Sequence, residues 1–99
     1  MTAPMLPSKR ASSFKKLYSQ LPDKVQHEAD EANRQFKTDP DAHGLNFKQI
    51  VGIYYSARVG AGHRALAARR TDCWLWFWIG SHADYDKFLD QLRRGRHGV

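Results

Sequence analysis

The chain has 99 residues, enough for one domain and too few for two. Lys and Arg number 16 against 10 Asp and Glu, and the formal net charge of +6 favours an anionic partner such as nucleic acid, the ribosome, an acidic protein or an anionic lipid. One cysteine, Cys73, excludes an internal disulfide and a cysteine metal cluster. No apolar stretch is long enough for a signal peptide or a membrane span, so we expect a cytoplasmic protein without membrane association.

The first third of the chain predicts a helical hairpin behind a flexible lead-in. Residues 1–10 contain two prolines and two basic residues and are expected to be flexible. Apolar residues three and four apart predict a helix over 12–21, capped by Ser12 or Ser13. The same spacing predicts a second helix over 23–37.

From Leu45 onward the apolar period changes to two, which predicts strands. Four strands are expected, over residues 45–50, 53–59, 63–69 and 73–79. Short loops join them, so the sheet is expected to be antiparallel, with the helices on one face. A last helix begins near Ser81, which can act as its N-cap.

The predicted fold class is therefore α+β. An N-terminal helical hairpin packs on a four-stranded antiparallel sheet, and a short C-terminal helix follows. The domain is expected to span residues 11–92, between a flexible N-terminus at 1–10 and a basic tail at 93–99.

Two arginines flank the predicted hairpin loop at residues 60–62. If the loop is symmetric, Arg58 and Arg64 lie opposite each other on one sheet face. Like charges placed so cost a few tenths to about 1 kcal/mol, so such a pair indicates an anion between them. The alternatives are that both side chains point to water, or that a shift of one residue in register separates them.

The last predicted strand is apolar on both faces and is expected to be covered on both sides. Strict alternation places three tryptophans on one face, Trp74, Trp76 and Trp78, and four apolar residues on the other, Cys73, Leu75, Phe77 and Ile79. One face packs on the helical hairpin. On the other face Trp76 and Trp78 can stack bases, with plain core packing as the alternative.

His82 and Tyr85 come at the opening of the last helix, three residues apart and therefore on one helix face. Histidine is the side chain best matched to proton transfer near neutral pH. With Arg58 and Arg64, the pair predicts a phosphate site that has an acid or base group and a ring; an ordinary surface histidine is the alternative.

The sequence has no P-loop, HExxH, glycine-rich dinucleotide motif or nucleophile signature. His43, His63 and His82 lack the spacing of a metal site. We therefore expect no metal and no cofactor.

Two segments, YSARVGAGHRAL and WFWIGSHADYDKF, together with the order of the elements, resemble the RelE/ParE superfamily of type II toxin–antitoxin toxins. The resemblance runs from about Phe14 to Leu89. It implies a compact α+β microdomain, a sheet curved around a concave face, and inhibition by a partner antitoxin. RelE-like members are ribosome-dependent endoribonucleases that cut mRNA, whereas ParE-like members poison DNA gyrase.

The resemblance also implies roles for single residues. Arg64 matches the hairpin arginine of the nuclease members, and Arg58 falls where they carry a basic strand residue. His82 matches their C-terminal arginine or histidine. Tyr85 is a looser match to the nearby aromatic residue.

Ser56 departs from the pattern, because RelE has a lysine near that position. Without this lysine, the implied chemistry depends more on His82. Lys48 or His43 is the candidate replacement for the missing lysine. Lys48 is accordingly expected to contact the substrate.

The implied reaction needs no metal. A base deprotonates an RNA 2′-hydroxyl, which attacks the adjacent phosphate while Arg58 and Arg64 stabilise the developing charge. His82 acts as the general acid or the base, and Tyr85, with Trp76 or Trp78, stacks a neighbouring base.

The sequence therefore leaves three candidate functions. An mRNA-cleaving toxin is favoured over a gyrase-poisoning toxin, and a non-toxic nucleic-acid-binding member of the fold comes third. For the toxins, an acidic antitoxin is expected to cover the face that carries the tryptophans and arginines.

Overall fold

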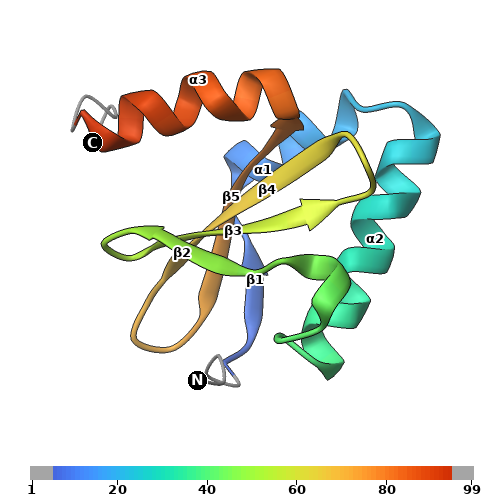
Figure 1. Ribbon diagram of the computed structural model, residues 1–99. Coiled ribbons are helices and arrows are strands. Elements are labelled where there is room, and N and C mark those ends of the chain that lie inside the picture. Colours follow the sequence, from blue (N-terminus) through green and yellow to red (C-terminus); the bar gives the residue numbers. More distant parts are fainter. Residues whose placement is uncertain (1–5, 95–99) are drawn as a thin grey trace.

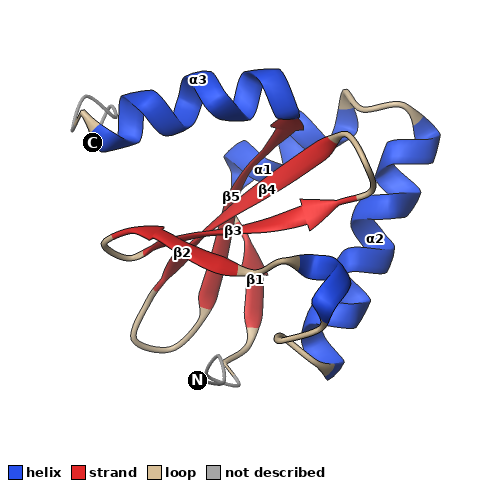
Figure 2. Ribbon diagram, viewed as in Figure 1, coloured by secondary structure: helices blue, strands red, loops and turns tan. Residues whose placement is uncertain are grey.

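The computed structural model describes residues 6–94. Its helices are α1 (Ser12–Ser19), α2 (Asp23–Thr38), the 3-10 helix η1 (His43–Leu45) and α3 (His82–Arg93). Its strands are β1 (Ser8–Arg10), β2 (Lys48–Val51), β3 (Tyr54–Val59), β4 (His63–Arg69) and β5 (Trp74–Ser81). The strands form one sheet in the order β1-β5-β4-β3-β2 (Figure 1), and Figure 2 distinguishes helices from strands. The predicted α+β class is confirmed.

The helical hairpin follows the prediction closely: α1 ends two residues earlier than expected, and α2 ends one residue later. The predicted cap of α1 is wrong. Ala11 occupies the N-cap position, and no side chain caps the helix. Ser13 instead donates its hydroxyl to the carbonyl oxygen of Phe77 at 2.8 Å, so it ties α1 to the sheet.

Strand β1 was not predicted, and it lies in the stretch that we expected to be a flexible lead-in. It runs parallel to β5, with Ser8 opposite Trp74. Backbone bonds hold both its ends: Trp74 N–H donates to Pro7 O at 2.8 Å, and Ala11 N–H donates to Trp76 O at 2.9 Å. Three polar residues show no alternation that predicts a strand; β1 forms because β5 has a free edge to pair with.

The first predicted strand begins three residues too early. Leu45 lies at the end of η1 and is buried in the core. Asn46, with a left-handed φ of 46°, then turns the chain, and β2 starts only at Lys48. Apolar side chains before the strand reflect packing of η1 on the core rather than strand alternation.

The helices cover both faces of the sheet, not one as expected. Helices α1 and α2 pack on one face with a core that includes Phe14, Phe36 and Trp74. On the opposite face, α3 packs with Tyr85 and Leu92 against Leu66 of β4. Figure 1 shows α3 lying across the sheet, apart from α2.

A β-bulge changes the expected alternation of β5. Leu66 pairs with Trp78 and Ala67 with Trp76, so Phe77 is the extra residue. Trp76 therefore faces α1 and α2, whereas Phe77 and Trp78 both pack on the α3 side. The prediction of three tryptophans on one face is wrong because the bulge interrupts the two-residue period.

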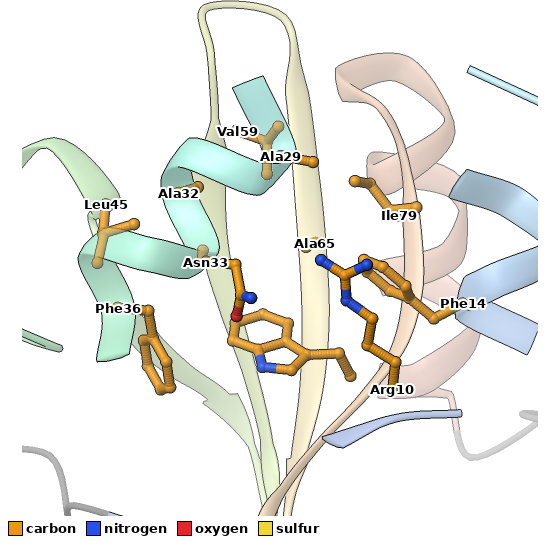
Figure 3. A pocket seen from close by; sticks show the side chains of 12 residues that line it. Arg10, Phe14, Ala29, Ala32, Asn33, Phe36, Leu45, Val59, Ala65 and Ile79 are labelled. Carbon is orange, nitrogen blue, oxygen red and sulfur yellow. The ribbon is translucent and has the colours of Figure 1, made fainter. Parts of the chain in front are cut away.

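A small cavity of about 30 Å³ lies in the core between α1, α2 and the sheet. Figure 3 shows apolar side chains around it, among them Ala32, Val59 and Ile79, with Arg10 and Asn33 as polar members of the wall. A space of this size holds about one water molecule, which is too little for an organic ligand.

Candidate functional site

The register of the hairpin, which the sequence left open, is the one expected for a symmetric loop. Arg58 lies opposite Arg64 across β3 and β4, and Val59 lies opposite His63. The symmetric loop at residues 60–62 sets this register, and Gly60 has the positive φ of 56° that such a loop needs. Both arginines therefore start from the same face of the sheet.

The two arginines nevertheless line different depressions. Arg58 is exposed and lines a depression beside α2, together with Glu28 and Gly44. Arg64 is half-buried and lines a different depression beneath α3. The structure therefore does not join the two guanidiniums into one anion site, and we leave Arg58 out of the candidate site.

The depression beneath α3, called the α3 groove from here on, lies between that helix and strands β2 and β4. Its walls consist of Lys48, Gln49, Ile50, Arg64, His82, Tyr85, Leu89 and Arg93. It thus brings together four residues that the sequence singled out, Lys48, Arg64, His82 and Tyr85. Among residues 6–94, no acidic side chain lines it.

Tyr85 holds two of these groups in place. The guanidinium carbon of Arg64 lies 5.3 Å from the centre of the Tyr85 ring, a cation–π contact. The ring of His82 stacks on the ring of Tyr85, with 6.1 Å between the ring centroids and 28° between the ring planes. Tyr85 itself is only 5% exposed. Its ring therefore positions Arg64 and His82, and little of it is accessible for stacking on a base.

His82 is exposed at the first turn of α3. Ser81 is the N-cap, as predicted, and its hydroxyl accepts the Asp84 N–H at 3.2 Å. The backbone N–H of His82 donates to Gly62 O at 2.9 Å. This bond ties the start of α3 to the hairpin loop, so the imidazole stands close to the strand that carries Arg64.

Lys48 of β2 lies beside Ser56 of β3, the position at which the sequence departs from the pattern of the nuclease members. Its partner in β3 is Ser56, so both residues point to the same sheet face. Ser56 is fully buried, and its Oγ has no hydrogen-bond partner within residues 6–94. Lys48 is exposed at the groove. A lysine one strand away thus reaches the face on which the expected lysine is missing.

Neither predicted tryptophan lines the α3 groove. Trp76 is a core residue, 6% exposed, with its Nε1 3.4 Å from Ser8 Oγ. Trp78 packs beneath α3 with its ring stacked on Phe88, 5.3 Å between centroids and 5° between planes. We therefore leave both out of the candidate site; Trp76 lies in the core, the alternative considered above, whereas Trp78 is partly buried and lines a separate depression beside α3.

Arg93 belongs to the groove and was missed as a site residue. The sequence contained a usable signal, because His82, Tyr85, Leu89 and Arg93 are spaced by three, four and four residues along one helix face. Assigning Arg93 to a basic tail hid this periodicity. Within residues 6–94, no helix is long and apolar enough to cross a membrane, and no group of three potential metal ligands occurs.

Comparison with solved structures places this arrangement among known folds. The RelB–RelE antitoxin–toxin complex from Methanococcus jannaschii matches with a TM-score of 0.62 and 15% identity, over 81% of this chain and 96% of that chain. The fold is that of RelE. YafQ from E. coli has the same RelE fold, with a TM-score of 0.66 and 9% identity over 81% of this chain and 97% of its own.

A third structure with the RelE fold is the toxin–antitoxin complex RelBE2 from Mycobacterium tuberculosis. It matches with a TM-score of 0.60 and 17% identity, over 82% of this chain and 98% of that chain. No family model and no curated protein sequence matches the chain. Similarity at these identities establishes the RelE fold of this chain, and its chemistry has to be argued from its own residues.

Proposed function

We propose that this protein is the toxin of a type II toxin–antitoxin system and acts in the cytoplasm as a metal-independent, ribosome-dependent mRNA endoribonuclease. The observation that carries the proposal is the contact of Arg64 and His82 with the Tyr85 ring in a groove that also contains Lys48. A fold shared with the toxin of the RelB–RelE complex supports it.

The proposed reaction uses the RNA itself as nucleophile. The 2′-oxygen attacks the adjacent phosphorus, the bond from phosphorus to the 5′-oxygen breaks, and a cyclic phosphate and a free 5′-hydroxyl result. Arg64 and Lys48 stabilise the negative charge that develops on the phosphate oxygens. His82 transfers the proton, either from the 2′-hydroxyl or to the 5′-oxygen. Because the nucleophile and the leaving group belong to one strand, the strand has to be held in line, a task that we assign to the ribosome.

We further propose an antitoxin as the protein partner. The M. jannaschii and M. tuberculosis structures are both complexes of a toxin with an antitoxin. The formal net charge of +6, and groove walls that contain no acidic side chain from the described part of the chain, fit an acidic segment that covers the groove.

The test is induced expression in a bacterial host of the wild type, His82→Ala and a control, His27→Ala, with primer extension on a translated mRNA. His27 lies on α2 beside the other depression, so its loss should leave cleavage intact. New cuts inside the reading frame, lost only with His82→Ala, would support the nuclease. Growth arrest with intact mRNA and a DNA-damage response would replace it with gyrase poisoning.

The role of His82 follows from the pH profile of cleavage on purified ribosomes. A rate that rises with pH, and no longer rises in His82→Ala, identifies His82 as the base; a rate that falls with pH, and no longer falls in that variant, identifies it as the acid. A profile that His82→Ala leaves unchanged would exclude both.

A further inference from the structure

The α3 groove extends well beyond the residues assigned to chemistry. From His82 to Arg93 the helix rises about 16 Å at about 1.5 Å per residue. One nucleotide of a stacked strand occupies only about 3.4 Å along its axis. Arg64 and His82 lie at the N-terminal end of α3, whereas Arg93 lies at its C-terminal end. A single phosphate therefore leaves part of the groove unused.

The far end of the groove is cationic. Arg93 is exposed there and lines the depression. The acidic residues of α3, Asp84, Asp86 and Asp90, do not line the groove. Within residues 6–94, Arg93 makes no ion pair, so its charge is not neutralised by a described neighbour.

Arg94, the residue that follows Arg93, is ion-paired and lines a different depression. Arg94 Nε lies 3.2 Å from Asp90 Oδ2, an ion pair across one helical turn. It lines a depression on the outer side of α3 with Lys87 and Gln91. Two neighbouring arginines thus differ in direction and in pairing, and only Arg93 belongs to the groove.

At the Arg64–His82 end of the groove, one buried hydrogen-bond donor lacks an acceptor among the described residues. Nη1 of Arg64 is buried and has no hydrogen-bond partner within the described residues. A buried charged donor without an acceptor costs free energy, and an anionic ligand on the same guanidinium offsets that cost. The groove therefore has a positively charged group at each end of α3.

We infer that Arg93 binds a phosphate of single-stranded RNA that flanks the scissile phosphate, so that the strand runs along α3 from His82 to Arg93. The inference rests on the proposed function, because it takes the Arg64–His82 end as the place of reaction. Arg93 is a substrate-binding residue in this arrangement and takes no part in the proton transfers.

The test compares Arg93→Ala with Arg94→Ala, which remove the same charge from adjacent positions of one helix. The ligand is a fluorescein-labelled 2′-O-methyl RNA hexanucleotide, in which the nucleophile is blocked, and binding is followed by fluorescence anisotropy between 50 and 200 mM KCl. Arg93→Ala should weaken binding about five- to tenfold and lower the slope of log K against log salt by about 0.7, the value for one phosphate contact on a single strand. Arg94→Ala should leave the slope unchanged. With a dinucleotide, which fills only one end of the groove, Arg93→Ala should have no effect.

Equal losses for the two arginines would overturn the inference, because they would show a response to overall charge alone. That result would leave the proposed function standing, provided that Arg64→Ala still weakens binding. Binding that neither Arg64→Ala nor Arg93→Ala changes would instead place RNA outside the groove, and it would overturn both the inference and the proposed nuclease site.

Discussion

The ring of Trp78 lies directly over the backbone of Gly80 on the α3 side of β5. A Cβ added at residue 80 would stand 2.7 Å from Cη2 of Trp78, closer than such atoms approach in proteins. Gly80 pairs with Arg64 in the neighbouring strand. Because glycine has no Cβ, residue 80 leaves room for the Trp78 indole, on which the ring of Phe88 of α3 stacks.

Gly80→Ala should therefore destabilise the protein. The rigid indole has to move, and overpacking of this kind costs about 1–3 kcal/mol. For a domain of this size, each kcal/mol lowers the melting temperature by about 4–8 °C. Gly62→Ala is the matched control, because its Cβ would meet no atom within 4 Å. Equal melting temperatures for the two variants would contradict the role assigned to Gly80.

Tyr85 should act through its ring rather than its hydroxyl. Tyr85→Phe keeps the surface beneath Arg64 and His82, so mRNA cleavage should stay within about threefold of wild type, since the cation–π contact of about 0.5–2 kcal/mol remains. Tyr85→Leu removes that contact and should lower cleavage by about tenfold or more. Phe88→Leu, an aromatic loss on the same helix but outside the groove, controls for weakened packing of α3. Loss of cleavage in Tyr85→Phe at unchanged stability would assign chemistry to the hydroxyl.

Lys48 should replace the lysine that is missing at Ser56. Lys48→Ala is expected to lower the rate of cleavage on purified ribosomes by about 10²-fold, the size of effect seen when one stabilising charge is removed from a transition state. Lys87→Ala removes the same charge from the outer side of α3 and should leave the rate unchanged. If both variants cleave at the wild-type rate, Lys48 has no part in the reaction.

Tyr18 should lose its proton at a higher pH than an ordinary tyrosine, because its hydroxyl donates a hydrogen bond to Asp30. Its hydroxyl donates to Asp30 Oδ1 at 2.8 Å, and this hydrogen bond to a carboxylate raises the pKa of Tyr18 above its ordinary value of 10.0, although Arg10 opposes the shift. Since the folded-state pKa is raised, the stabilisation is fully present below about pH 10 and is lost as the pH rises through the folded-state pKa. A difference titration at alkaline pH, wild type minus Tyr18→Phe, gives the midpoint of Tyr18. Asp30→Asn should lower that midpoint; an unchanged value would mean that Asp30 is not the cause.

Filling the core cavity should stabilise the fold. Val59 lines the cavity of about 30 Å³, and Val59→Ile adds one methylene group to that wall. Burial of a methylene contributes up to about 0.8 kcal/mol, so the free energy of unfolding in urea should rise by up to that amount. Val25→Ile, at a buried position that does not line the cavity, should give no gain. A lower stability for Val59→Ile would show that the cavity cannot accept the added group.

Several features were predictable from the sequence because they depend on interactions over a few residues. The bounds of α2 and the Ser81 N-cap follow from apolar spacing and capping chemistry. The register that sets Arg58 opposite Arg64 was one of the alternatives that the sequence left open. The resemblance of two segments to the RelE/ParE superfamily likewise predicted the α+β class that the structure confirms. His82, Tyr85, Arg64 and Lys48 were singled out by the same local patterns and by the resemblance, and the fold brings all four together.

The tertiary structure alone decided the rest. The bulge at Phe77 turns Trp78 away from Trp76, and β1 forms only because the edge of β5 is open to it. Arg58 and Arg64 share a sheet face, yet their side chains end in different depressions. Arg93 has the helical spacing of His82, Tyr85 and Leu89, but only the packing of α3 across the sheet makes that helix face part of the groove. Each of these outcomes depends on contacts between residues far apart in the chain, for which a local pattern carries no information.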